Sequence, residues 1–211
     1  MKSLPWRLRF PSRWPERKVP GPRAAPVVDE SAPARVVAMP GLRALPRPAL
    51  RWVGNGGKIA LRPFEWNADA DAICQWQIET YALNFPDFHF NEAFASAFRH
   101  DLRRAILDDQ HGIFVLDEGP SGGKSCGFIW LVVCQNSWTN ERYGYINNLY
   151  VAPEKRGQEL AGALLDFSNE WFKTRRISKL RLTVTASNSA ACRLYEKNGY
   201  SVTRLEMEKD I

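Results

Sequence analysis

The sequence predicts an α/β fold with a mixed, mainly antiparallel twisted sheet that is flanked by helices on both faces. Segments with strand-like and helix-like periodicity follow one another in the order β-α-α-β-β-β-α-β-α-β. A turn-rich connection at residues 118–123 joins two apolar runs, as in a hairpin between antiparallel neighbours. An apolar content of 45% is ample for the buried core that such a fold requires.

Residues 1–57 are expected to form an extended basic arm that precedes the folded domain at 58–211. Ten of the fourteen prolines lie before residue 50, and proline lacks the backbone N–H that helices and central strands need. The arm carries 11 Lys or Arg against 3 acids, whereas the domain carries 18 against 20. The basic character of the chain therefore belongs to the arm, and a Gly-rich hinge at 54–57 separates the two parts.

The elements of the domain follow from periodicity and from turn residues. Residues 58–62 alternate as a first strand does, and helical stripes at 67–83 and 91–107 flank Pro86. The remaining elements are expected as strands at 113–117, 127–134, 143–151 and 179–185, helices at 157–175 and 188–198, and a last strand from Tyr200 to about Lys209.

The four cysteines indicate neither a metal site nor a disulfide framework, because they form no CxxC pair and no histidine lies at ligand spacing. No stretch reaches the roughly 18 apolar residues that a membrane span needs. No apolar segment of the signal-peptide type follows the basic N-terminus. We therefore expect a cytoplasmic protein without a membrane segment. The alternative is an organelle, if the basic arm is a targeting segment.

Two linked motifs carry the functional prediction. In the first, a β-rich run at 149–152 stops at Pro153, and a basic, glycine-containing turn opens an apolar-periodic helix. In the second, Asn188 starts a short helix that carries Tyr195 and ends at Gly199. A turn that points successive backbone N–H groups and a helix N-terminus outward is suited to binding a diphosphate.

Together these motifs resemble the GCN5-related N-acetyltransferase (GNAT) superfamily over residues 58–211. The resemblance implies a GNAT-like domain that uses acetyl-CoA as co-substrate and no metal, and that transfers acetyl to a primary amine by direct attack in a ternary complex. The acceptor is a small molecule, a peptide N-terminus or a protein lysine. Residues 83–91, with three phenylalanines, would form an acceptor wall suited to an apolar or aromatic group.

By this resemblance, the turn binds the pyrophosphate of acetyl-CoA. The family pattern reads Gln/Arg-x-x-Gly-x-Gly/Ala, and Glu159 stands here where the pattern has its middle glycine. Backbone N–H groups form the cradle, so a Glu159 side chain that points to solvent leaves it intact. The expected cradle residues are Arg156, Gly157, Gln158, Glu159, Leu160, Ala161 and Gly162.

The resemblance also implies roles for the neighbouring strand and helix. Main-chain groups of Leu149 and Val151 would bind the pantetheine arm, and the N–H near Leu149 would polarise the thioester carbonyl. Asn188 would bond the cofactor arm, and Tyr195, two helical turns later, would protonate the departing CoA thiolate. The alternatives are a plain helix cap for Asn188 and a core aromatic for Tyr195.

The sequence leaves the general base open. Relatives often place a carboxylate on the strand before the cradle, where this chain has Tyr145, Asn147 and Asn148. Glu79, Glu141 or a chain of waters are the possible substitutes.

Two further functions follow from the departures and from the arm. A non-catalytic acyl-CoA-binding or scaffold protein with the same fold is one, because of Glu159 and the missing strand carboxylate. In the other, the basic arm tethers the enzyme to nucleic acid or to an acidic partner. The protein is expected to be a monomer or a homodimer.

Overall fold

The computed structural model describes residues 51–52, 58–85, 87–119 and 123–209. All of these residues belong to one unit of the chain, Ala44–Ile211. Most of the expected arm, its hinge and Pro86 therefore lie outside the described residues. The last part of the arm segment contributes a strand, because residues 51–52 pair with residues 58–59.

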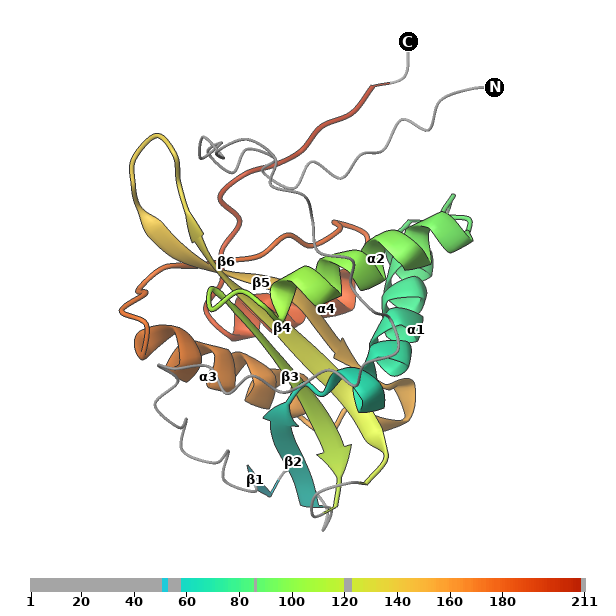
Figure 1. Ribbon diagram of the computed structural model, residues 1–211. Helices are drawn as coiled ribbons and strands as arrows, with labels where there is room; N and C mark the ends of the chain where they lie inside the picture. Colours follow the sequence, from blue (N-terminus) through green and yellow to red (C-terminus); the bar gives the residue numbers. More distant parts are fainter. Residues whose placement is uncertain (1–50, 53–57, 86, 120–122, 210–211) are drawn as a thin grey trace, which may run out of the picture. The chain divides into compact units, whose positions relative to one another are not determined.

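Six strands form one sheet in the order β1-β2-β3-β4-β5-β6. Neighbouring strands are antiparallel except β5 and β6, which are parallel, so the predicted mixed and mainly antiparallel sheet is confirmed (Figure 1). The strands are β1 (Arg51–Trp52), β2 (Lys58–Pro63), β3 (His111–Glu118), β4 (Ser125–Gln135), β5 (Arg142–Val151) and β6 (Leu180–Arg181).

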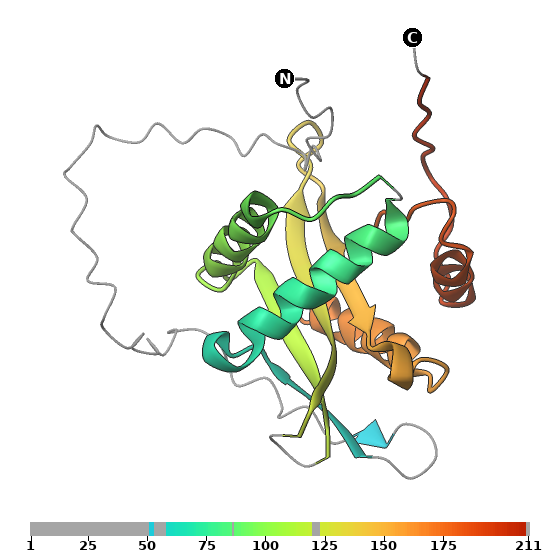
Figure 2. The same cartoon turned by 90° about the vertical axis from the view of Figure 1, so that its right-hand side faces the viewer.

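Helices cover both faces of the sheet, as the sequence predicts. Trp76 of the first helix stacks on Phe128 of β4, whereas Phe114 of β3, which is paired with Ile129, meets Phe167 of the third helix edge to face. Figure 2 shows the second and fourth helices on opposite sides of the strands. The helices are α1 (Trp66–Asn84), α2 (Glu92–Ala105), α3 (Leu160–Lys173) and α4 (Ser189–Lys197), with a short 3-10 helix η1 (Pro153–Lys155).

The core lies between these layers and is centred on β3 and β4. Positions 126–133 of β4 are all buried, because helices cover both faces of this strand. A strand that is buried on both sides reads as a continuous apolar run rather than as an alternating one. This explains why the sequence shows an unbroken apolar run here, whereas the residues of β2 alternate.

A buried ionic network joins the first helix to three strands. The Arg62 guanidinium donates from Nη1 and Nη2 to the Asp69 carboxylate at 2.6 and 2.8 Å, and from Nε to Asp117 at 2.5 Å. Asp117 also accepts from the Ser125 hydroxyl at 2.9 Å, and Asp69 accepts from the Glu65 N–H at 2.7 Å. The two carboxylates are 1% and 0% exposed. They require this partner, because an unpaired buried charge is strongly unfavourable.

Two predicted strands differ from the structure. Of the strand expected at 179–185, only Leu180–Arg181 pairs with a neighbouring strand. The strand expected from Tyr200 to about Lys209 is not formed, and the prediction was wrong: Val202, Leu205 and Met207 are 73%, 82% and 91% exposed. Alternation specifies a strand only where a neighbouring edge completes the ladder, and two residues of β6 offer too little edge.

Replacing Arg62 by Met should lower the free energy of unfolding by about 3 kcal/mol or more, since two buried carboxylates lose their partner. Arg99→Met is the matched control, because its partner Asp71 is bound at the same 2.5 Å but is 88% exposed. We expect the control to cost less than about 1 kcal/mol. Urea unfolding of both variants measures the difference, and equal losses would contradict a structural role for the network.

Candidate functional site

An open strand edge begins where β6 separates from β5. The ladder between the two strands contains only Gly144–Leu180 and Tyr145–Arg181, whereas β5 continues to Val151. Beyond Tyr145, no described strand pairs with the β6-facing edge of β5. At the end of β5, the main-chain groups on one side face the neighbouring strand β4, and those on the other side face no described strand.

The phase of the β4–β5 ladder shows which main-chain groups face this open edge. The Ala152 N–H donates to the Cys126 carbonyl at 2.9 Å, and hydrogen-bonded pairs alternate along an antiparallel ladder. Leu149 and Val151 are therefore in non-hydrogen-bonded positions, with N–H and C=O directed away from β4. The Val151 carbonyl accepts from Arg156 Nε at 3.0 Å, which agrees with this direction.

The turn that follows uses two left-handed residues. Gly157 has φ of 76° and Glu159 has φ of 61°. The sequence predicts a helix from Gly157, but α3 begins at Leu160 because these residues form a turn first. A side chain at positive φ costs energy that glycine avoids. The left-handed backbone at Glu159 gives the physical reason why a glycine suits this position of the pattern.

The backbone N–H groups of this turn are available to a ligand. The N–H groups of Leu160, Ala161 and Gly162 lie in the first turn of α3, where no preceding helical carbonyl can accept them. None of the three, nor those of Gly157 and Gln158, donates to a backbone group that the structure describes. A Cβ added at Gly157 or Gly162 would meet nothing within 4 Å, so both face open space.

Glu159 and Arg156 flank this turn. Glu159 is exposed and makes no side-chain cap, so its carboxylate is directed to solvent and not to the N–H groups of α3. The Arg156 guanidinium lies 5.9 Å from the centroid of the Tyr150 ring. The turn thus combines one anchored cation with free N–H donors, an arrangement suited to an anionic ligand at a helix N-terminus.

Tyr195 lies on α4 and is half-buried. Its ring meets Tyr200 edge to face at 5.8 Å. Burial raises the pKa of Tyr195 to about 12, with smaller contributions from Tyr200, Cys192 and Tyr145. The hydroxyl is therefore protonated at neutral pH and is able to donate a proton.

Asn188 caps α4 and also bridges to α1. Its side-chain oxygen accepts from the Ala191 N–H at 3.1 Å, and its amide donates to Asn84 Oδ1 at 3.0 Å. Asn84 is the last residue of α1, 104 positions earlier in the chain. The cap expected from the sequence is present, and the bridge joins the start of α4 to the end of α1.

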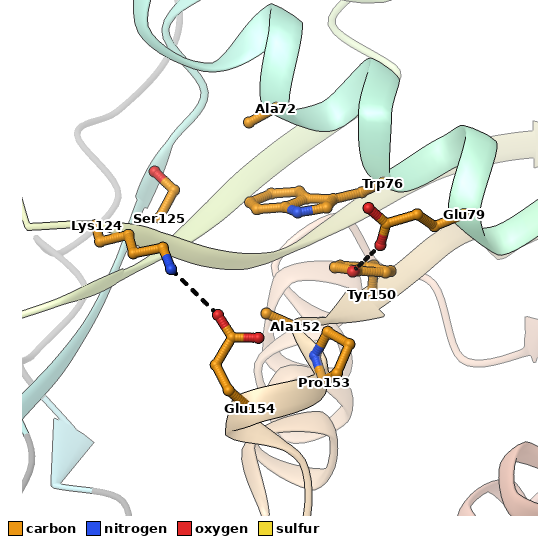
Figure 3. Close-up of a pocket in the computed structure, with 9 residues that line it drawn as sticks. All are labelled: Ala72, Trp76, Glu79, Lys124, Ser125, Tyr150, Ala152, Pro153 and Glu154. Atoms are coloured by element: carbon orange, nitrogen blue, oxygen red, sulfur yellow. Dashed lines mark hydrogen bonds and ion pairs between the residues drawn. The ribbon is translucent and has the colours of Figure 1, made fainter.

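A pocket of about 540 Å³ opens between α1 and the end of β5 (Figure 3). The Trp76 and Tyr150 rings stack with centroids 5.2 Å apart, and the Tyr150 hydroxyl donates to the Glu79 carboxylate at 2.5 Å. Burial and the Glu79 carboxylate both raise the pKa of Tyr150, so its hydroxyl remains a donor. The lining residues are Ala72, Trp76, Glu79, Lys124, Ser125, Tyr150, Ala152, Pro153 and Glu154.

A chain of amides lies on β5 where the family pattern has a carboxylate. The register shifts between Trp130 and Leu131, which leaves Asn147 as an extra residue in β5. Asn147 donates to Asn148 at 2.7 Å, and Asn148 donates to Gln77 of α1 at 2.5 Å. These side chains bond one another and carry no ionisable group, so none of them is a general base.

The two glutamates considered as bases lie at opposite ends of β5. Glu141 is bound by Lys179 and Arg181, and the Lys179 ammonium lowers the pKa of Glu141. At about 3.3 Å per residue, Glu141 is roughly 25 Å along the strand from Leu149. Glu79 instead reaches the residue after Leu149 through its bond with Tyr150. Of the two glutamates, only Glu79 lies at the open end of β5.

Within the described ranges, no group of three or more His, Cys, Asp or Glu side chains is placed to hold a metal ion. All four cysteines are free, and burial raises the pKa of Cys126 to about 11. No helix among the described residues combines the length and the hydropathy needed to cross a membrane.

The fold and the turn together match one family. The model of the acetyltransferase (GNAT) family matches residues 70–200, so this chain belongs to the GNAT family.

Curated relatives support this membership. A mycothiol acetyltransferase from Amycolatopsis mediterranei is 29% identical over 166 residues, which cover 74% of this chain and 49% of that protein. GCN5-related N-acetyltransferase 6, chloroplastic, from Arabidopsis thaliana is 36% identical over 67 residues, or 32% of this chain and 23% of that protein. The chain thus spans less than half the length of these relatives.

Solved structures share the fold. A putative acetyl transferase from Pyrococcus furiosus has a TM-score of 0.57 at 24% identity, over 72% of this chain and 99% of that one. A predicted acetyltransferase from Clostridium acetobutylicum, solved with acetyl-CoA, has a TM-score of 0.57 at 18% identity, over 72% of this chain and 96% of that one. At these identities the likeness concerns the fold.

Sequence reasoning did not identify the pocket. Ala72, Trp76 and Glu79 have the spacing of one helix face, which is the signal that groups them. Tyr150 and Lys124 join them only through the packing of α1 over β4 and β5. That packing is a tertiary contact that periodicity does not encode.

Replacing Glu159 by Gly should leave the free energy of unfolding unchanged or raise it by up to about 1 kcal/mol, because Gly adopts the left-handed backbone without strain. Glu159→Val should lower it by more than about 1 kcal/mol, since a β-branched residue is disfavoured there. Glu170→Gly, at an exposed position inside α3, is the control and should cost about 1 kcal/mol. Thermal unfolding measures all three, and a stabilising Val at 159 would contradict the assigned backbone.

Proposed function

We propose that the protein is an N-acetyltransferase that transfers acetyl from acetyl-CoA to a primary amine by direct attack in a ternary complex. The observation that carries the proposal is the turn at 156–162, whose outward N–H groups lie directly after the open edge of β5. A diphosphate fits the N–H groups at the start of α3, and an extended arm with amide groups fits the main chain of Leu149 and Val151.

The residues have separate roles in this reaction. The N–H of Leu149 stabilises negative charge that develops on the thioester oxygen. Tyr195 gives its proton to the sulfur as the C–S bond breaks and the C–N bond forms, and the proton that the attacking nitrogen releases restores the Tyr195 hydroxyl. Its pKa of about 12 keeps that proton in place at neutral pH. Arg156, Gly157, Gln158, Leu160, Ala161 and Gly162 hold the diphosphate, and Glu159 faces solvent.

A small-molecule amine is the favoured acceptor. The similar proteins include a mycothiol acetyltransferase and a streptothricin acetyltransferase, whose names refer to small molecules. CoA release in the presence of amines separates this function from non-catalytic acyl-CoA binding, in which acetyl-CoA binds but no amine increases CoA release.

Acetyl-CoA should stabilise the protein against thermal unfolding. A concentration one hundred times the dissociation constant adds about 2.7 kcal/mol by mass action. Differential scanning fluorimetry over a range of acetyl-CoA concentrations measures this shift. An unchanged melting temperature at millimolar acetyl-CoA would rule out the cofactor assignment.

Replacing Tyr195 by Phe should lower kcat by about 10²–10⁴-fold, because the ring is kept and the proton donor is lost. The dissociation constant for acetyl-CoA should change by less than about threefold. Tyr200→Phe, which removes a hydroxyl from the neighbouring ring, is the control and should retain its turnover. If Tyr195→Phe turns over as fast as the wild type, Tyr195 is a core aromatic only.

A further inference from the structure

The pocket between α1 and β5 has an excess of negative charge. Lys124 and Glu154 form an ion pair at 3.3 Å on its rim, where their side chains are 75% and 53% exposed. Their charges offset each other. Glu79 is half-buried and bonds only neutral groups, the Tyr150 hydroxyl at 2.5 Å and the Gln75 amide at 3.5 Å. Its carboxylate therefore supplies the net charge of the pocket.

Aromatic rings form the wall beside this carboxylate. Trp76 stacks on Tyr150 with an interplanar angle of 18°, and Figure 3 shows Glu79 next to the two rings. The faces of indole and phenol rings attract cations, and the attraction strengthens where water is excluded. Ala72, Ala152 and Pro153 complete an apolar lining. A carboxylate beside stacked rings is suited to an organic cation with an apolar group.

We propose that this pocket binds the acceptor as its ammonium ion, with Glu79 as the counterion and Trp76 as the apolar wall. The inference rests on the proposed function, because a primary amine is protonated at neutral pH before it reacts. It specifies the substrate class as a cationic amine that carries an apolar or aromatic group. The pocket lies on the α1 side of the same end of β5, because Tyr150 stands between Leu149 and Val151, whose main-chain groups face the open edge.

Two cations lie near Glu79, and neither forms an ion pair with it. Lys124 is paired with Glu154. The Arg156 guanidinium, 5.9 Å from the Tyr150 ring centroid, bonds the neutral Val151 carbonyl and keeps its charge, but it is not among the residues that line the pocket. Glu79 has no cationic partner among the described residues. A cationic ligand would supply one.

Two probes that share the phenethyl group test the proposal on the full chain. Phenethyltrimethylammonium carries the charge and cannot be acetylated, whereas 2-phenylethanol is neutral. By calorimetry, the cation should bind at least about tenfold more tightly than the alcohol. Equal affinities, or no binding of the cation at millimolar concentration, would overturn the proposal.

A charge-removing variant assigns the selectivity to one residue. Glu79→Gln retains an oxygen that accepts from Tyr150, and should weaken binding of the cation by about tenfold while leaving the alcohol unchanged. Glu170→Gln, exposed on α3, is the matched control and should leave both affinities unchanged. An unaltered affinity of Glu79→Gln for the cation contradicts the role of Glu79.

The thermal shift with acetyl-CoA separates this inference from the proposed function. A Glu79→Gln variant that keeps the shift is folded and retains the cofactor site, so its lost cation affinity reports on the pocket. If the wild type shows the shift but no preference for the cation, the acceptor pocket is wrong and the acetyltransferase proposal stands. If it prefers the cation but shows no shift, the pocket binds a cation outside this reaction, and both the proposed function and the acceptor assignment fail.

Discussion

The ionic network around Arg62 is the constraint on which the placement of α1 depends. One guanidinium satisfies two carboxylates that are almost fully buried, one at the start of α1 and one on β3. Because the desolvation of both acids is offset only in this geometry, the helix has little freedom to shift over the sheet. Trp76 and Glu79 lie further along the same helix and so take their positions over Tyr150 from this anchor.

The second determinant is the early separation of β6 from β5. Two residue pairs hold the strands together, and beyond them no described strand pairs with this edge of β5. The unpaired N–H and C=O groups of an exposed edge can pair with another strand. Here the edge is followed directly by η1 and by the turn into α3. A surface suited to an extended chain is therefore followed by one suited to an anion. The proposed cofactor has amide groups and a diphosphate in this order.

Much of the fold follows from local signals, and the pocket does not. Periodicity and turn residues located α1, α2 and the strands β3 to β5 to within a few residues, because their apolar residues face the core. The strand expected at 200–209 is not formed, since a local sequence pattern cannot supply the neighbouring edge that a strand needs. The motif located the turn, yet the left-handed backbone at Glu159 appears only in the structure. The pocket depends on side chains 71 positions apart, such as Glu79 and Tyr150, which meet through packing.

The central claim is that the turn at 156–162 and the open end of β5 form one binding surface. Hydrogen–deuterium exchange of the full chain with and without acetyl-CoA tests it most directly, because the N–H groups in question have no backbone acceptor among the described residues. The account predicts slower exchange at 149–151 and 157–162 on addition of acetyl-CoA, with little change in α2. Unchanged exchange in both segments, or protection confined to α2, would contradict it.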